Sequence, residues 1–254
     1  MNTLIKSKIN QLLQELPQGV VVLASWLHSK GYSYELQRRY KESQWLESIG
    51  NAALKRKGDT IDVYGALYAL QYQADKKVHV GGISSLAMQG FAHYIKMEEK
   101  RVYLFSDTNF NVPKWFQHYV WSETAVIIKR NTFHATLGLI DFRHQNFSIK
   151  ISSPARAVME CLEMSPSQFD LVEAYQILEG LNSLTPYDVQ VLLENCTSVK
   201  VKRLFLFLAE KCGHAWFNYL NFEKINLGSG KRMIVENGVY IIKYQITVPK
   251  SLAL

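Results

Sequence analysis

The first 58 residues change their hydrophobic period, from the three-to-four-residue repeat of helices to the two-residue repeat of strands. Apolar side chains at helical spacing predict an amphipathic helix over residues 3–15 and a second helix over residues 21–29, which ends at Gly31. Ser33 is a residue type that caps helix N-termini, and it precedes a third predicted helix at residues 34–42. The chain therefore begins with three short helices in succession.

A short β-hairpin is predicted directly after these helices. Residues 45–49 alternate apolar and polar side chains, Gly50-Asn51 is a turn signal, and residues 53–57 form a second strand that is closed by Gly58-Asp59. Three short helices followed by a hairpin are typical of a winged helix-turn-helix, in which one helix enters the DNA major groove and the hairpin lies along the backbone. A further helix is predicted over residues 62–73.

The positive charge of the chain lies partly in this first region. The sequence has 29 Lys and Arg against 22 Asp and Glu, which gives a formal net charge of +7 and a pI of about 9.2. Residues 1–58 hold nine basic and four acidic side chains, whereas residues 151–254 hold ten of each. A basic excess on a predicted winged helix indicates an anionic partner, and double-stranded DNA is the partner that suits this fold.

From residue 76 onward the sequence mixes strand and helix patterns. Strands rich in β-branched and aromatic residues are predicted at 78–80, 101–105, 124–129, 133–139 and 147–151. Helices are predicted at 84–95, 155–162, 169–181, 186–195 and 199–211, and a terminal hairpin joins 233–235 to 239–246 through Asn237-Gly238. The predicted fold class is α+β, with a winged helix-turn-helix at residues 1–75 and a mixed α+β C-terminal domain at residues 76–254. That domain is strand-rich to about residue 151 and mostly helical afterwards.

Cysteine usage and apolar runs predict a cytoplasmic protein without a membrane segment. The three cysteines, Cys161, Cys196 and Cys212, are widely spaced and odd in number, which is a poor disulfide framework. The longest pronounced apolar run, residues 204–209, is far shorter than the roughly 20 residues that cross a bilayer.

Candidate DNA-binding residues follow from the predicted winged helix. Side chains of types that contact base edges lie in the first half of the third helix: Gln pairs with adenine and Arg with guanine. They are Ser33, Tyr34, Gln37 and Arg38. Cations that suit phosphates lie further along the third helix and on the hairpin. Contacts to phosphates fix the register of a protein on DNA. These cations are Arg39, Lys41, Lys55, Arg56 and Lys57. Charge clusters taken singly are usually solvated surface, but their combination with this fold favours DNA.

A second set of basic residues has three open interpretations. It comprises residues 96–101 together with Lys129, Arg130, Arg143 and Lys150. In the first interpretation these side chains extend the DNA footprint, in the second they bind RNA, and in the third they form an ordinary solvated surface. The sequence does not distinguish these three interpretations.

Several consecutive blocks of the chain resemble one family, the AbiEi antitoxins of bacterial type IV toxin–antitoxin (abortive infection) systems. The blocks cover residues 45–50, 53–59, 65–71, 78–94, 152–160 and 227–232. One departure is Ala52-Ala53-Leu54, where the family pattern has a glycine and an aromatic residue at the start of the second wing strand. The resemblance covers most of the chain.

The resemblance implies two activities and their partners. The N-terminal winged helix is expected to bind inverted repeats in the promoter of its own operon and repress it, as a monomer or dimer on DNA. The C-terminal domain is expected to counter a nucleotidyltransferase-fold toxin encoded beside the antitoxin, without a stable complex between the two.

No residue pattern points to catalysis, a cofactor or a metal. Residues 228–231 lack the spacing of a phosphate loop and are predicted to form a turn, while Ser84 or Ser85 is predicted to cap a helix. The histidines show no paired metal-ligand spacing. The aromatic residues 215–220 are predicted to pack in the core rather than to bind a partner.

Two other classes of protein stay open beside the antitoxin. One is a nuclease or RNA-modifying enzyme in residues 76–254, which needs a cluster of carboxylates and has Asp107, Glu123 and Asp141 as candidates by composition alone. The other is a module that only binds proteins and shows no specific affinity for an operator.

Overall fold

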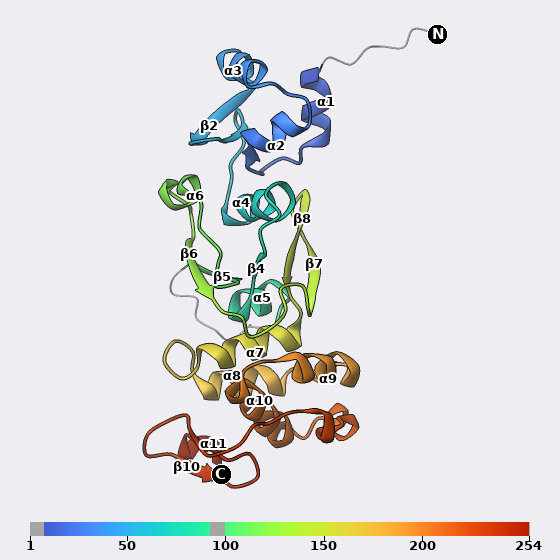
Figure 1. The fold of residues 1–254 in the computed structure, drawn as a ribbon, viewed down its shortest axis with the longest axis vertical. Helices are drawn as coiled ribbons and strands as arrows, with labels where there is room; N and C mark the ends of the chain where they lie inside the picture. Colours follow the sequence, from blue (N-terminus) through green and yellow to red (C-terminus); the bar gives the residue numbers. More distant parts are fainter. Residues whose placement is uncertain (1–7, 92–99, 254) are drawn as a thin grey trace, which may run out of the picture.

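The computed structural model describes residues 8–91 and 100–253, and its parts follow one another along a long axis (Figure 1). The N-terminal helices lie at one end, a five-stranded sheet lies in the middle, and a helical layer with a small terminal sheet forms the other end. The α+β class is thereby confirmed.

The N-terminal module contains the three predicted helices and the predicted hairpin, but the second helix begins at Ala24 and not at residue 21, because Val22 and Leu23 form an additional strand. Its elements are α1 (Lys8–Glu15), β1 (Val22–Leu23), α2 (Ala24–Ser29), α3 (Tyr34–Glu42), β2 (Leu46–Gly50) and β3 (Ala53–Arg56). β1 is too short to show an alternating pattern, and it pairs antiparallel with β3 to give the sheet order β1-β3-β2. Residues 3–7 of the first predicted helix lie outside the described residues.

The departure from the family pattern at the start of the hairpin's second strand leaves the hairpin intact. Ala52 adopts a φ of 58°, in the left-handed region that glycine enters without strain. The next two side chains, Ala53 and Leu54, are buried, and Leu54 pairs with both Val22 and Ser48. The register therefore places the strand's first two side chains in the core.

The central region is a mixed sheet in the order β6-β5-β4-β8-β7. Neighbours β5 and β6 are parallel, as are β4 and β8, and the other pairs are antiparallel. The elements of this region are α4 (Val63–Tyr68), the π-helix η1 (Ala69–Gln73), β4 (Val78–Val80), α5 (Gly82–Met88), β5 (Arg101–Ser106), α6 (Lys114–His118), β6 (Thr124–Lys129), β7 (Leu139–His144) and β8 (Phe147–Ser152).

Three predictions in this region need correction. The helix at 62–73 divides into an α-helical and a π-helical turn, and the helix at 84–95 begins at Gly82 and ends at Met88, with residues 92–95 outside the described part. The strand predicted at 133–139 is a loop, and the strand that pairs with β8 starts at Leu139.

The last hundred residues form a helical layer that α7 connects to the sheet (Figure 1). Its helices are α7 (Pro154–Met164), α8 (Leu171–Glu179), α9 (Pro186–Asn195), α10 (Val199–Cys212), the 3₁₀-helices η2 (Ala215–Tyr219) and η3 (Phe222–Lys224), and α11 (Lys250–Ala253). All four predicted helices are present. Trp216 of the aromatic segment is buried in this layer, as predicted, while Tyr219 is exposed.

The terminal sheet has a different pairing from the predicted hairpin. It consists of β9 (Arg232–Met233), β10 (Val239–Ile241) and β11 (Ile246–Val248) in the order β10-β11-β9. β10 pairs antiparallel with β11, and β9 lies parallel to β11, so the predicted pairing across Asn237-Gly238 is wrong.

A single hydrophobic cluster joins the N-terminal module to the central sheet. It contains Val20 and Leu67 from the first 75 residues and Val80, Trp115 and Ile149 from the rest. The two parts thus share a core across residue 75.

Close backbone contacts fix the same junction. A Cβ atom at Gly65 would lie 2.0 Å from the carbonyl oxygen of Gly19, so α4 packs against the turn before β1 at a distance that only glycine permits. The Gln73 side chain accepts from Leu23 N at 2.7 Å and donates to Val21 O at 2.9 Å, which covers one edge of β1.

Candidate nucleic-acid interface and buried ion-pair network

The third helix carries a basic exposed face. Its N-cap Ser33 accepts a hydrogen bond from Leu36 N at 3.2 Å, which confirms the predicted cap. Arg38 and Arg39 are exposed and form ion pairs one turn away on the same helix, at 3.4 Å to Glu42 and 2.8 Å to Glu35. Such exposed pairs contribute only about 0.3–0.5 kcal/mol, so both guanidinium groups are available to a stronger anionic partner.

Tyr34 extends this face toward the preceding helix. It is 58% exposed, and its ring stacks on His28 of α2 with centroids 4.5 Å apart and planes 5° from parallel. Lys41 is also exposed on α3. Sequence reasoning missed His28, because nothing in the sequence shows that the turn between α2 and α3 brings the two rings together.

Gln37 does not belong to the exposed face, which corrects its prediction as a base-reading residue. Its side chain is 3% exposed, and its Nε2 donates to Ala24 O at 3.0 Å and Tyr32 O at 2.8 Å. These bonds hold α3 against α2. An amide that satisfies two buried carbonyls has a structural role, since leaving them without a donor is costly.

The three basic residues of the hairpin have different positions. Arg56 donates from Nη2 to Leu13 O and Leu16 O at the end of α1, which corrects its prediction as a phosphate contact. The side chain of Lys55 is only 15% exposed and donates to Asp59 O at 2.8 Å. Lys57 is 52% exposed, with Glu47 at 3.7 Å. Of the three, Lys57 is the cation on the surface.

The second basic set is not gathered on one surface. Lys129 and Arg130 lie at the end of β6, one edge strand of the sheet, whereas Arg143 lies on β7, the other edge strand. Lys150 is paired with Asp141 at 2.6 Å. Residues 96–99 lie outside the described residues.

The carboxylates proposed for an enzyme are likewise dispersed. Asp107 follows the end of β5, Glu123 precedes the start of β6, and Asp141 lies on β7 at the far edge. Among residues 8–91 and 100–253 the structure shows no group of three or more His, Cys, Asp or Glu that fits a metal ion.

Two other sequence features have structural roles. Residues 228–231 lie in a loop before β9, as predicted, and Arg203 holds it by donating to Leu227 O at 2.8 Å and Gly230 O at 2.7 Å. Ser84 and Ser85 are not helix caps. Ser84 Oγ accepts from Tyr103 N at 2.9 Å, and Ser85 Oγ donates to Ser152 O at 2.6 Å.

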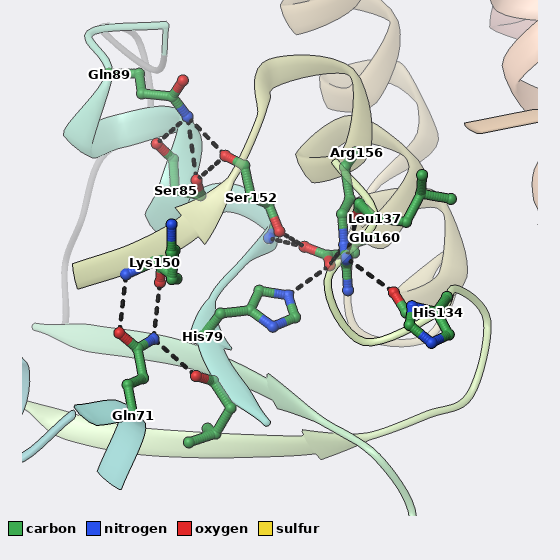
Figure 2. A network of polar contacts seen from close by, with 12 residues as sticks. Gln71, His79, Ser85, Gln89, His134, Leu137, Lys150, Ser152, Arg156 and Glu160 are labelled. Atoms are coloured by element: carbon green, nitrogen blue, oxygen red, sulfur yellow. Dashed lines mark hydrogen bonds and ion pairs between the residues drawn. The ribbon is translucent and has the colours of Figure 1, made fainter. Parts of the chain in front are cut away.

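Glu160 of α7 is the centre of a buried polar network that the sequence did not reveal (Figure 2). Its carboxylate accepts from His79 Nε2 at 2.9 Å, Arg156 Nε at 2.8 Å, Ser152 Oγ at 2.7 Å and Gly82 N at 2.9 Å. These donors come from β4, α7, β8 and the start of α5, so one carboxylate joins the sheet to both helices.

Further polar side chains continue the network along the sheet (Figure 2). Gln89 donates to Ser152 O at 3.0 Å, which ties the end of α5 to β8. On the other side of β8, Gln71 donates to Val78 O at 2.8 Å and to Lys150 O at 3.0 Å. The network thereby fixes the pairing of β4 with β8, which is otherwise a short parallel contact.

Burial and charge shift the titration of the two central groups. Burial lowers the pKa of His79, which is therefore neutral at pH 7. For Glu160, burial raises the pKa, but His79, Arg156 and the hydrogen bond from Ser152 together lower it to about 2. The ionised Glu160 can only accept, so His79 Nε2 carries the proton in their shared hydrogen bond.

Acidification is expected to destabilise the protein through both groups. Each has a lower pKa in the folded chain than in the unfolded chain, so the unfolded chain binds protons more readily as pH falls. The free energy of unfolding should decrease below pH 6.5, the usual pKa of histidine, and again between pH 4.5 and about 2 as Glu160 is protonated. Urea denaturation measured from pH 7.5 to pH 3 tests this. The conclusion fails if Glu160→Gln has the same pH dependence below pH 4.5 as the wild-type protein.

Family comparisons agree with this architecture. The chain matches two adjoining models of a transcriptional regulator: residues 5–97 match the "AbiEi antitoxin N-terminal domain", and residues 99–249 match "Transcriptional regulator, AbiEi antitoxin, Type IV TA system". The protein is therefore a transcriptional regulator. More particularly, it belongs to the AbiEi antitoxin family of type IV toxin–antitoxin systems.

A solved structure shares the fold at low sequence identity. The crystal structure of the RV2827C protein from Mycobacterium tuberculosis is 14% identical and superposes with a TM-score of 0.57, over 94% of this chain and 88% of that one. No curated protein matches the chain. None of the helices within residues 8–91 and 100–253 is long and apolar enough to cross a membrane.

Proposed function

We propose that this antitoxin represses its own operon by binding operator DNA through a winged helix-turn-helix in its first 58 residues. The observation that carries the proposal is the exposed basic face of α3. The predicted DNA-binding side chains that remain exposed are Ser33, Tyr34, Arg38, Arg39 and Lys41 on or beside α3, and Lys57 after β3. The element order helix, strand, helix, helix, strand, strand with a sheet β1-β3-β2 supports the winged-helix assignment.

The proposed mechanism at the promoter is steric. The N-terminal half of α3 enters the major groove, where Arg38 pairs with guanine, while Arg39, Lys41 and Lys57 contact phosphates. Inverted repeats in the operator then take one copy of the protein on each half-site, as separate monomers or as a dimer. Occupied half-sites exclude RNA polymerase. This activity places the protein in the cytoplasm.

The second proposed activity is neutralisation of a nucleotidyltransferase-fold toxin encoded in the same operon. Membership of the AbiEi family supports it. The structural candidate for this activity is residues 76–254, whose terminal sheet lies at the opposite end of the molecule from α3 (Figure 1).

Operator binding should depend strongly on salt. Three exposed cations of the proposed interface, Arg39, Lys41 and Lys57, contact about three phosphates, so the logarithm of the binding constant should fall with the logarithm of salt concentration with a slope of roughly −3 for each bound copy. Fluorescence anisotropy with labelled DNA from upstream of the operon measures this, and a scrambled duplex of equal length is the control. Equal affinity for both duplexes, or a slope near zero, would contradict the proposal.

A further inference from the structure

A cavity of about 320 Å³ opens beside the Glu160 network. It lies where the parallel strands β5 and β6 reach their carboxyl ends, and the loop after β6 and helix α7 complete its wall. Crevices at the carboxyl ends of parallel strands are common ligand sites in open sheets. The volume is at the lower limit of small-molecule sites, which hold roughly 300–1,000 Å³.

His79 presents one unused acceptor to this cavity. Its ring forms part of the cavity wall, and its Nε2 donates to Glu160. The neutral ring therefore has its lone pair on Nδ1, and no hydrogen bond to Nδ1 occurs among the described residues. Glu160 fixes this tautomer, so the lone pair on Nδ1 can accept a hydrogen bond from a ligand.

Glu163 supplies a second unused acceptor on the same wall. It lies one turn after Glu160 on α7, and its Oε2 is buried without a hydrogen bond from any described residue. Its other carboxylate oxygen lies 3.9 Å from Arg130 Nε. Unpaired buried carboxylate oxygens are rare in native proteins, and a ligand that donates a hydrogen bond here removes the deficit.

Cations line the same cavity. Arg130 and Lys77 both line it, with side chains 57% and 46% exposed. Among the described residues, Lys77 forms its ion pair with the exposed Asp75, at 2.6 Å, and Arg130 pairs loosely with Glu163, so an anionic group can recruit both. The rings of Phe105 and Phe133 add an apolar surface to the wall.

We propose that this cavity binds a nucleoside monophosphate whose base bears an exocyclic amine. A ligand must donate hydrogen bonds to His79 Nδ1 and Glu163 Oε2, contact the aromatic wall, and present an anion to Arg130 and Lys77. The amine and the ribose hydroxyls supply the donors, the base supplies a flat apolar face, and the phosphate supplies the anion. This site is separate from the proposed DNA interface and does not depend on it.

Titration calorimetry of the full chain tests the ligand class. Adenosine 5′-monophosphate and cytidine 5′-monophosphate should bind saturably with one site per chain. Uridine 5′-monophosphate, which lacks the amine, adenosine, which lacks the phosphate, and inorganic phosphate should each bind at least five to ten times more weakly. The proposal is overturned if neither amine-bearing nucleotide binds, or if inorganic phosphate binds as tightly as they do.

Two substitutions test the assigned contacts. Arg130→Gln should weaken adenosine 5′-monophosphate at least tenfold and leave adenosine unchanged, because it removes a phosphate contact. Glu163→Gln should reduce the preference for adenosine 5′-monophosphate over uridine 5′-monophosphate. Arg143→Gln, an exposed arginine on the opposite edge strand, is the matched control and should change nothing. Circular dichroism verifies that each variant is folded, and unchanged nucleotide affinity in folded Arg130→Gln overturns the proposal.

Discussion

Replacing Glu160 with alanine is expected to lower the free energy of unfolding by about 3–5 kcal/mol, because it leaves a buried cation without its partner. Arg156 is 4% exposed, and its Nε donates to Glu160 while its Nη1 donates to Leu137 O. Removing the carboxylate also leaves Gly82 N and Ser152 Oγ without their acceptor. Urea denaturation at pH 7.5 measures the loss.

Two control variants separate this effect from a general loss of negative charge. Glu236→Ala removes an exposed carboxylate from the loop before β10 and should change stability by less than about 0.5 kcal/mol. The double variant Glu160→Leu with Arg156→Met replaces the ion pair by apolar side chains and should recover the part of the loss that comes from the unpaired cation, while Gly82 N and Ser152 Oγ still lack an acceptor. A loss below about 1 kcal/mol for Glu160→Ala would show that the network contributes little to stability.

Elements whose ends depend on local signals match their predicted bounds. Helix α9 spans Pro186–Asn195 as predicted, since Thr185 caps it by accepting from Asp188 N at 3.2 Å. Strand β6 spans Thr124–Lys129 as predicted, because β-branched residues dominate that segment. In both cases neighbouring residues determine the conformation.

Pairing between separate segments was predicted less well, because the competing partners are distant in sequence. Asn237-Gly238 signals a tight hairpin, yet β10 pairs with the later strand β11, whose Ile246 and Val248 are fully buried. Phe133 begins a predicted strand but lies in a loop, where its ring packs 5.3 Å from the Arg156 guanidinium. Tertiary packing thus overrides the strand propensity of residues 133–139.

In the candidate sites, too, contacts between side chains that are distant in sequence were not predicted from local patterns. His79 and Glu160 are 81 positions apart, so no local motif indicates their contact. Arg156 and Glu160 do have the i,i+4 spacing of a helical ion pair, but exposed helices use that spacing as well. Gln37 and Arg56 have the chemistry of DNA contacts, but Gln37 is buried against α2, and the half-buried Arg56 donates to a backbone carbonyl of α1.

This contrast yields a test of the proposed DNA interface, in which two arginines from the same module should behave oppositely. Arg38→Ala is expected to weaken operator binding by about 1–3 kcal/mol, roughly 5- to 150-fold, and to leave stability unchanged, because its side chain is exposed. Arg56→Ala should lower the free energy of unfolding by about 1–3 kcal/mol, since Leu13 O and Leu16 O lose their donor, while the folded variant keeps its operator affinity within about threefold.

Anisotropy titrations and urea denaturation of both variants measure the two quantities side by side. A further readout separates repression from toxin neutralisation: full-length Arg38→Ala, expressed from an unrelated promoter, should fail to repress the operon but still rescue growth from the toxin. Wild-type operator affinity in Arg38→Ala, or a large loss of affinity in folded Arg56→Ala, would assign the DNA to another surface. Loss of growth rescue in Arg38→Ala would show instead that α3 takes part in opposing the toxin, because this exposed substitution leaves the core of the rest of the chain intact.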